Sequence, residues 1–201
     1  KIDPVRFIGN YSSGKMGFAL AEACAERGAE VTLVAGPVSL KTHHPAIKRI
    51  DVESAGEMYQ AAMTAFPSSD AAILCAAVAD YRPENASEQK IKRETEREMT
   101  LHLVPNPDIA ASLGAIKREG QVMVGFALET NDEATHAEGK LKRKNLDFIV
   151  LNSLRDQGAG FRCDTNKITI IDNAGGVTSY PLKTKREVAC DIVNKLVTLL
   201  K

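Results

Sequence analysis

The run A-A-I-L-C-A-A-V at residues 71–78 is apolar throughout, and Q-V-M-V-G-F-A at residues 121–127 is nearly so. Strands with one solvated face alternate polar and apolar residues. Continuous apolar runs of this length are typical of strands buried on both faces of a parallel sheet. We therefore predict two buried strands, with residues 71–78 at the centre of the sheet.

Strand and helix patterns alternate on either side of these runs. Ser54 and Glu57 form a capping box ahead of a helical pattern. Asn106 followed by Pro107 is typical of a helix start, with Asn at the cap and Pro at the first helical position. Strands are predicted at 30–35, 47–52 and 147–151, and helices over 16–27, 54–66, from 106–108 onward and over 133–144. Such alternation predicts parallel strands joined by crossover helices.

The C-terminal part changes pattern. Residues 167–172 and 177–181 flank N-A-G-G at 173–176, which predicts an antiparallel hairpin at one edge of the sheet, and a last helix follows over 183–200. The predicted fold class is α/β: one Rossmann-like domain over residues 1–201, with a mostly parallel sheet, helices on both faces and a C-terminal antiparallel hairpin. Residues from about 80 to 98 form a long polar loop, which we expect to be a mobile lid.

Composition excludes several classes of protein. The chain has 26 basic and 26 acidic residues, and this neutrality argues against a nucleic-acid-binding surface. An apolar run long enough to span a membrane is absent from the sequence. The four scattered cysteines fit reduced thiols in a cytoplasmic protein better than disulfides or a zinc site.

The segment G-N-Y-S-S-G-K-M-G at residues 9–17 is the first candidate for binding chemistry. It begins like a phosphate-binding loop, but Met16 stands where Ser or Thr would hold magnesium. Small residues leading into a helix still favour an anion, because free N–H groups and the helix dipole meet there. The alternative is that Ser12 or Ser13 merely caps the helix.

Three further segments each suggest phosphate binding weakly. Asp80 lies just after a predicted buried strand, where α/β proteins bind ligands. The run K-I-K-R at 90–93 carries three cations, and K-L-K-R-K at 140–144 places Lys140 and Lys144 on one helix face. Each also has an ordinary interpretation: a polar loop, a solvated charge run, or lysines favoured by a helix C-terminus. Taken together, they indicate a nucleotide or phosphoester ligand.

In their order and spacing, these segments resemble the phosphopantothenoylcysteine synthetase family, the ligase half of a bacterial bifunctional coenzyme A biosynthesis protein. The resemblance is carried by D-P-V-R-F-I-G-N-Y-S-S-G-K-M-G (3–17), A-A-V-A-D-Y-R (76–82), K-I-K-R (90–93), N-P-D-I (106–109), G-F-A-L-E-T (125–130) and K-x-x-x-K-N-L-D (140–147). Arg93 replaces the last lysine of the family's K-x-K-K motif, and Gly9 stands where relatives often have serine.

The resemblance implies a homodimeric ligase that uses CTP and Mg²⁺. It would activate 4′-phosphopantothenate as an acyl-cytidylate with release of pyrophosphate, and cysteine would then displace CMP. Family members begin with a strand ahead of the D-P-V-R motif, which we expect to be missing from a chain that starts at Lys1. A flavin-dependent decarboxylase domain is the usual fused partner, so no FMN is expected on this domain.

The resemblance also assigns roles. Asn10 and Lys90 are the expected catalytic residues, and Arg6 is expected to reach a substrate in the neighbouring protomer. Expected substrate contacts are Arg6, Asn10, Ala76, Ala77 and Asp80. Expected nucleotide contacts are Ser12, Ser13, Gly14, Lys15, Gly17, Leu74, Cys75, Ala76, Asp80, Lys90, Pro107, Asp108, Ile109, Ala110, Phe126, Lys140 and Lys144. Taken without the resemblance, the residues do not identify metal ligands or decide between CTP and ATP.

Two other functions remain open. A nucleotide-binding or assembly module, with catalysis lost or carried by a partner domain, would bind nucleotide without releasing pyrophosphate. A P-loop kinase or NTPase would hydrolyse nucleotide without other substrates, although Met16 argues against it.

Overall fold

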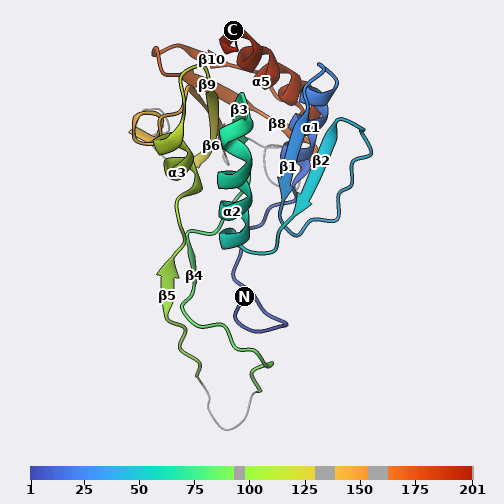
Figure 1. The fold of residues 1–201 in the computed structure, drawn as a ribbon. Helices are drawn as coiled ribbons and strands as arrows, with labels where there is room; N and C mark the ends of the chain where they lie inside the picture. Colours follow the sequence, from blue (N-terminus) through green and yellow to red (C-terminus); the bar gives the residue numbers. More distant parts are fainter. Residues whose placement is uncertain (93–97, 130–138, 154–162, 201) are drawn as a thin grey trace.

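The computed structural model describes residues 1–92, 98–129, 139–153 and 163–200 (Figure 1). Its elements in chain order are α1 (Lys15–Ala25), β1 (Val31–Ala35), β2 (Ile47–Asp51), α2 (Ala55–Ala65), the short 3-10 helix η1 (Phe66–Ser68), β3 (Ala71–Leu74), β4 (Tyr81–Pro83), β5 (Leu103–Pro105), α3 (Ile109–Ile116), β6 (Val122–Glu129), β7 (Phe148–Ser153), β8 (Thr165–Asn166), β9 (Ile168–Asp172), β10 (Val177–Ser179), β11 (Lys183–Thr184) and α5 (Lys185–Leu199). Residues 139–143 are also helical. In the described ranges, no helix is long and apolar enough to cross a membrane.

A five-stranded sheet in the order β10-β9-β7-β6-β3 forms the centre of the fold. Strands β3, β6 and β7 run parallel, while β9 is antiparallel to β7 and β10 is antiparallel to β9. Strands β1 and β2 form a separate parallel pair. The predicted α/β class and the C-terminal antiparallel hairpin are therefore confirmed.

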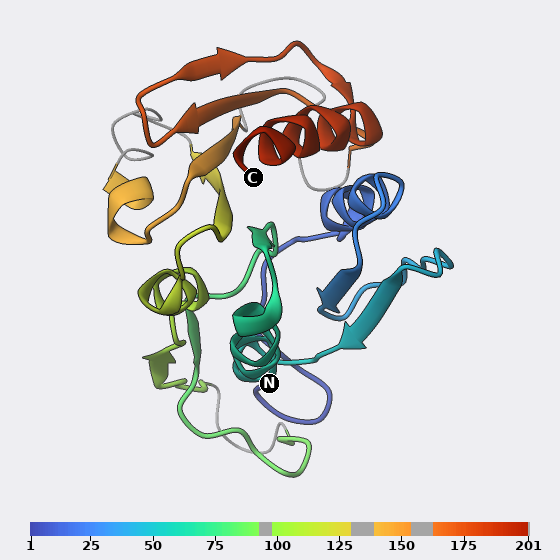
Figure 2. The same cartoon turned by 45° about the horizontal axis from the view of Figure 1, so that its top comes forward.

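Helices cover both faces of the sheet, and the strands alternate between two hydrophobic cores. Val124 and Phe148 point toward α1 and α5, which lie side by side in Figure 2, whereas Met123 and Ile149 point toward α2 and α3. All four side chains are buried. The continuous apolar pattern of these strands follows, because successive side chains in a strand point to opposite faces.

The prediction for residues 71–78 was partly wrong. Only Ala71–Leu74 forms a strand, and its side chains are half-buried. Among the described strands β3 pairs with β6 alone, so it lies at an edge of its sheet instead of the centre. Edge strands lose cover on one side, which accounts for the partial exposure. The rest of the run, from Cys75 onward, is a connecting segment.

The predicted lid begins as an ordered arm. Strand β4 pairs antiparallel with β5, and Figure 1 shows the pair projecting from the body of the molecule beside the N-terminal loop. Residues 93–97 of the predicted loop lie outside the described residues. Most of the predicted helix over 133–144 does as well, since residues 130–138 are not described.

Candidate nucleotide and substrate site

The start of α1 forms one wall of a cavity of about 280 Å³. The N-cap residue is Gly14, whose φ of 76° is left-handed. Because glycine has no side chain, it makes no capping hydrogen bond to the first N–H groups of the helix. A Cβ at Gly14 would lie 3.1 Å from Val38. The interpretation that Ser12 or Ser13 caps the helix is therefore wrong. The first N–H groups of a helix lack intrahelical acceptors, so this end is suited to an anion.

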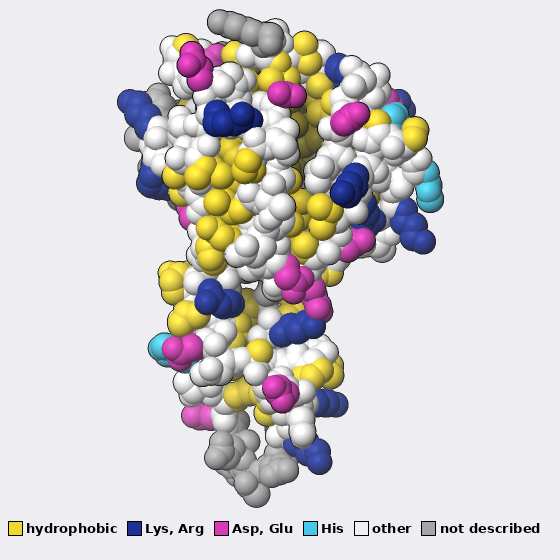
Figure 3. Space-filling view, viewed as in Figure 1, with side chains coloured by type: hydrophobic (Ala, Val, Ile, Leu, Met, Phe, Trp, Pro, Cys, Tyr) yellow, Lys and Arg dark blue, Asp and Glu magenta, His cyan; other side chains and the backbone are white. Residues whose placement is uncertain are grey.

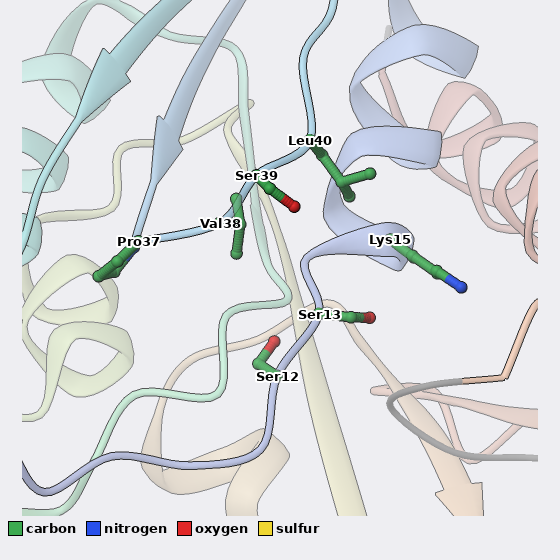
Figure 4. Close-up of a pocket in the computed structure, with 7 residues that line it drawn as sticks. All are labelled: Ser12, Ser13, Lys15, Pro37, Val38, Ser39 and Leu40. Carbon is green, nitrogen blue, oxygen red and sulfur yellow. The ribbon is translucent and has the colours of Figure 1, made fainter.

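Residues 37–40 form the opposite wall of the same cavity, and the sequence analysis missed them. Figure 4 shows Ser12 pointing toward this loop, while the side chains of Ser13 and Lys15 point away from it; the lining residues are Ser12, Ser13, Lys15, Pro37, Val38, Ser39 and Leu40. The loop follows the carboxyl end of β1, where ligands bind in α/β sheets. The same rule that singled out Asp80 could have found it.

Asn10 joins the first two candidate segments. Its side-chain Nδ2 donates to the carbonyl oxygens of Ala77 at 3.3 Å and Val78 at 3.2 Å. Because β3 ends at Leu74, the segment that follows is free to lie against the N-terminal loop. The expected catalytic residue Asn10 therefore lies directly beside Ala77, one of the expected substrate contacts.

The segment after β3 also lies against the start of α3. The Asn106 N–H donates to the Asp80 carbonyl at 2.7 Å, and Asn106 Nδ2 donates to the Ala79 carbonyl at 2.8 Å. Arg82 Nη1 donates to the Pro105 carbonyl at 2.6 Å. Asn106 is therefore a tether between two loops, and the prediction that it caps the helix was wrong.

Asp108 is the N-cap of α3, and it forms an ion pair with the candidate residue Lys144. Its Oδ1 accepts from the Ala111 N–H at 3.0 Å, and its Oδ2 pairs with Lys144 Nζ at 3.1 Å. Partial burial opposes ionisation of Asp108, but these hydrogen bonds outweigh it and hold its pKa below the ordinary value. The Lys144 N–H donates to the Lys140 carbonyl at 3.0 Å, which confirms that these lysines are one helical turn apart.

A second lysine, Lys185, lies near Lys15 without lining the cavity. Lys15 Nζ pairs with Asp164 at 2.6 Å, and the buried Lys185 donates from Nζ to the Cys163 carbonyl at 2.6 Å. Burial, together with the charge of Lys15, lowers the pKa of Lys185. Sequence reasoning missed Lys185, because at the start of a C-terminal helix it resembles any other exposed helical lysine.

Three expected nucleotide contacts belong to the core as much as to the site. Leu74 packs into the core beneath α2 and α3, while Cys75 and Phe126 pack into the core beneath α1 and α5. Desolvation raises the pKa of the Cys75 thiol to about 12. This thiol is therefore protonated at neutral pH and is not a nucleophile.

Two other candidates lie at the arm: Arg6 is in the N-terminal loop beside it, and Lys90 is in the segment that follows β4. Arg6 pairs with the buried Asp3 at 2.5 Å, and its Nη2 also donates to the Ile91 carbonyl at 2.9 Å. Lys90, next to Ile91, is exposed. Figure 3 shows the arm as a narrow extension of the molecule carrying both basic and apolar side chains. Within this chain, the arm projects away from the body that carries α1 (Figure 1).

The His, Cys, Asp and Glu side chains that the structure describes do not form a metal-binding cluster. Across the described residues, no group of three or more His, Cys, Asp or Glu could hold a metal ion. Mg²⁺ in nucleotide sites is bound largely by phosphates and water, with only one or two protein carboxylates. A magnesium ion that arrives with a nucleotide would therefore need no such group.

Known proteins match this chain over nearly its whole length. A family model described as the DNA/pantothenate metabolism flavoprotein C-terminal domain matches residues 1–200. A cysteine/cysteine sulfinic acid decarboxylase from an unknown prokaryotic organism is 59% identical over 199 residues, 99% of this chain and 55% of that protein. The coenzyme A biosynthesis bifunctional protein CoaBC of Vibrio parahaemolyticus is 48% identical over 200 residues, 99% of this chain and 50% of that protein.

A solved structure is similar to this chain in both sequence and fold. The crystal structure of the C-terminal domain of a coenzyme A biosynthesis bifunctional protein CoaBC matches with a TM-score of 0.83 and 38% identity, covering 100% of this chain and 89% of that one. The present chain spans about half the length of the two curated relatives above. The family model and the solved structure are both described as C-terminal domains.

Proposed function

Because this chain belongs to the family of DNA/pantothenate metabolism flavoprotein C-terminal domains, we propose that it is a phosphopantothenate–cysteine ligase domain of coenzyme A biosynthesis. Family membership confirms the resemblance carried by the sequence motifs. The contact of Asn10 with residues 77 and 78, which joins two of those motifs, is the observation that most supports the activity.

The proposed reaction has two steps. The carboxylate of 4′-phosphopantothenate attacks the α-phosphorus of CTP, pyrophosphate leaves, and an acyl-cytidylate forms. The amine of cysteine then attacks the acyl carbon, CMP leaves with the bonding electron pair, and an amide remains after loss of a proton. Activation is needed because an unactivated carboxylate would have to expel oxide.

The described residues suit this chemistry. The uncapped start of α1, with Lys15 beside it, offers N–H groups and positive charge to the phosphates. Lys144 pairs with Asp108 at the start of α3, and the loop just before α3 contacts the segment after β3. We propose that the nucleoside binds beside these contacts. In our proposal, one N–H of the Asn10 side-chain amide exchanges its backbone carbonyl acceptor for the acyl oxygen. The new hydrogen bond stabilises the negative charge that develops on that oxygen. Mg²⁺ would accompany the triphosphate and neutralise part of its charge.

We also propose that the active form is a homodimer in the cytoplasm. The N-terminal loop exposes Val5 at 63%, Phe7 at 72% and Tyr11 at 80%, and the arm beside it exposes Tyr81 at 55%. A second copy would cover such apolar side chains and bring Lys90 and Arg6 to a neighbouring site. The four described cysteines are free thiols, which suits a reducing compartment. A fused decarboxylase domain would occupy the other half of a full-length protein, as the length of the relatives suggests.

Pyrophosphate release tests the proposal. The full-length protein is mixed with phosphopantothenate, cysteine and Mg²⁺, and with CTP or ATP in parallel. We expect release that requires phosphopantothenate and is faster with CTP. No release with either nucleotide, from folded protein, would disprove the ligase assignment.

Three other outcomes would point elsewhere. Nucleotide binding by calorimetry without pyrophosphate release would indicate a binding module. Carbon dioxide release from cysteine or cysteine sulfinic acid by this domain alone would extend to it the activity named for the 59% identical relative. Phosphate release from nucleotide alone would indicate an NTPase.

A further inference from the structure

Asp3 is a buried carboxylate that holds together two distant parts of the chain. Its side chain has no exposed surface. Oδ1 accepts from the N–H groups of Val5 and Arg6, both at 2.8 Å. Oδ2 accepts from Arg6 Nε at 3.0 Å, from Arg6 Nη2 at 2.5 Å and from the Ile91 N–H at 3.1 Å. Its pKa lies far below the ordinary value, chiefly because of the Arg6 guanidinium, so the group is ionised.

The two Oδ1 bonds are those of an ordinary Asx turn. A turn alone would need neither burial nor a partner elsewhere in the sequence. The hydrogen bond from the Ile91 N–H to Asp3 joins residues 88 positions apart. Arg6, the ion-pair partner of Asp3, also donates from Nη2 to the Ile91 carbonyl. Both peptide groups of Ile91 are therefore held by one Asp–Arg pair.

A second bond fixes the same segment three residues before Lys90. The Ser87 N–H donates to the Ile2 carbonyl at 2.9 Å, and Ser87 Oγ donates to the Gln89 carbonyl at 2.6 Å. Lys90 thus lies between two anchors, Ser87 and Ile91, that are both attached to residues 2–6. Its side chain is exposed while its backbone is restrained on each side.

We propose that Asp3 is a positioning residue for Lys90: it holds the lysine-bearing segment against the N-terminal loop, so that Lys90 and Arg6 are presented together. The inference rests on the proposed function, in which Lys90 contacts the triphosphate. Pre-positioning matters because displacement of a reacting group by about 1 Å can reduce a rate by about a hundredfold. Asp3 itself contacts no reacting atom.

The structural part is tested by amide hydrogen exchange over residues 87–92 of the full-length protein. Asp3→Asn keeps the shape but removes the charge that holds Arg6 and Ile91. We expect exchange of the Ile91 amide to accelerate by about tenfold or more, because hydrogen bonds to charged groups are the stronger ones. Asp51→Asn is the matched control, since Asp51 also pairs with an arginine, Arg49 at 2.6 Å, but its side chain is 69% exposed.

The kinetic part uses a double-mutant cycle on pyrophosphate release. Asp3→Asn should slow release by about tenfold to a hundredfold and leave the KM for cysteine unchanged. If Asp3 acts through Lys90, Asp3→Asn combined with Lys90→Ala should be no more than about twofold slower than Lys90→Ala alone. A merely structural defect would multiply with the Lys90 effect. Asp51→Asn should release pyrophosphate at the wild-type rate.

Ile91→Pro provides a second variant, in case Asp3→Asn fails to fold. It removes the one N–H that Asp3 Oδ2 accepts from this segment and leaves the buried carboxylate in place. Like Asp3→Asn, it should slow pyrophosphate release. Unchanged exchange at residues 87–92 in Asp3→Asn, or full multiplication of the two kinetic defects, would overturn the inference. Absence of ligase activity in the wild type would instead disprove the proposed function, while the exchange result would still decide whether Asp3 restrains the segment.

Discussion

The amide of Asn10 donates to the backbone carbonyls of Ala77 and Val78, 67 and 68 positions away in the chain. This contact ties the loop ahead of α1 to the segment after β3. Both segments carry residues expected at the substrate, so the contact locates the centre of the candidate site.

Asn10→Ala should abolish most pyrophosphate release with little loss of stability. The two bonds are exposed, and a typical intramolecular hydrogen bond contributes only about 1 kcal/mol. Release is measured under single turnover, and unfolding by thermal melting. Asn10→Asp is the control that keeps the size of the side chain but removes the donor, and it should be equally slow. Retained turnover in both variants would show that Asn10 only joins the two loops.

Lys144→Met should weaken nucleotide binding by about tenfold, as expected for loss of one charge-assisted contact of about 1.4 kcal/mol. Lys144 pairs with Asp108 at the start of α3, so the variant also leaves that carboxylate near the nucleotide without its cation. Calorimetry with CTP gives the dissociation constant. Lys142→Met, an exposed lysine of the same helical segment, should bind as the wild type does. Equal losses in both variants would argue for a general charge effect.

Gly14→Ala should destabilise the protein by about 1–2 kcal/mol, the usual cost of a left-handed non-glycine residue. Its φ is 76°, and the new Cβ would press against Val38 at 3.1 Å. Because Gly14 begins the helix that faces the cavity, nucleotide affinity should fall as well. Denaturant unfolding and calorimetry measure the two effects. Gly56→Ala, within α2 and free of a close contact, should instead stabilise by about 0.5–1 kcal/mol.

Stability should fall in acid partly through Asp172. Hydrogen bonds from Lys195 and from the Gly176 N–H hold the pKa of Asp172 below its ordinary value. A group whose pKa is lower in the folded than in the unfolded chain stabilises the fold fully above the unfolded value, about 4 for Asp. That stabilisation is lost as pH falls through the folded value. Asp172→Asn should therefore be less stable than the wild type at pH 7 and lose less stability on acidification.

Urea unfolding between pH 7 and pH 2 checks this prediction. Asp51→Asn serves as the control, because its carboxylate is 69% exposed and lies outside the hairpin turn. Parallel pH profiles for Asp172→Asn and the wild type would contradict the assignment.

Residues 121–127 were predicted as a strand because their apolar run suits a strand buried on two faces, and residues 147–151 were predicted as a further strand; both are found in the sheet. The capping serine Ser54 and the hairpin turn at 173–176 were also predicted correctly, since each depends on neighbours within four residues. Asn106 was assigned to the wrong role, because a side chain that can cap a helix can equally bond a distant carbonyl. The burial of residues 71–78 was overestimated for a related reason: an apolar run does not reveal which strands lie beside it.

The sequence by itself determined the fold class and the family, because periodicity, turn residues and ordered motifs are local properties of the chain. Only the tertiary structure decided that Asp3 holds Ile91, that Lys144 pairs with Asp108, and that residues 37–40 face the start of α1. These partners lie far apart in sequence. Their meeting depends on how strands and helices pack, and no local pattern encodes that arrangement.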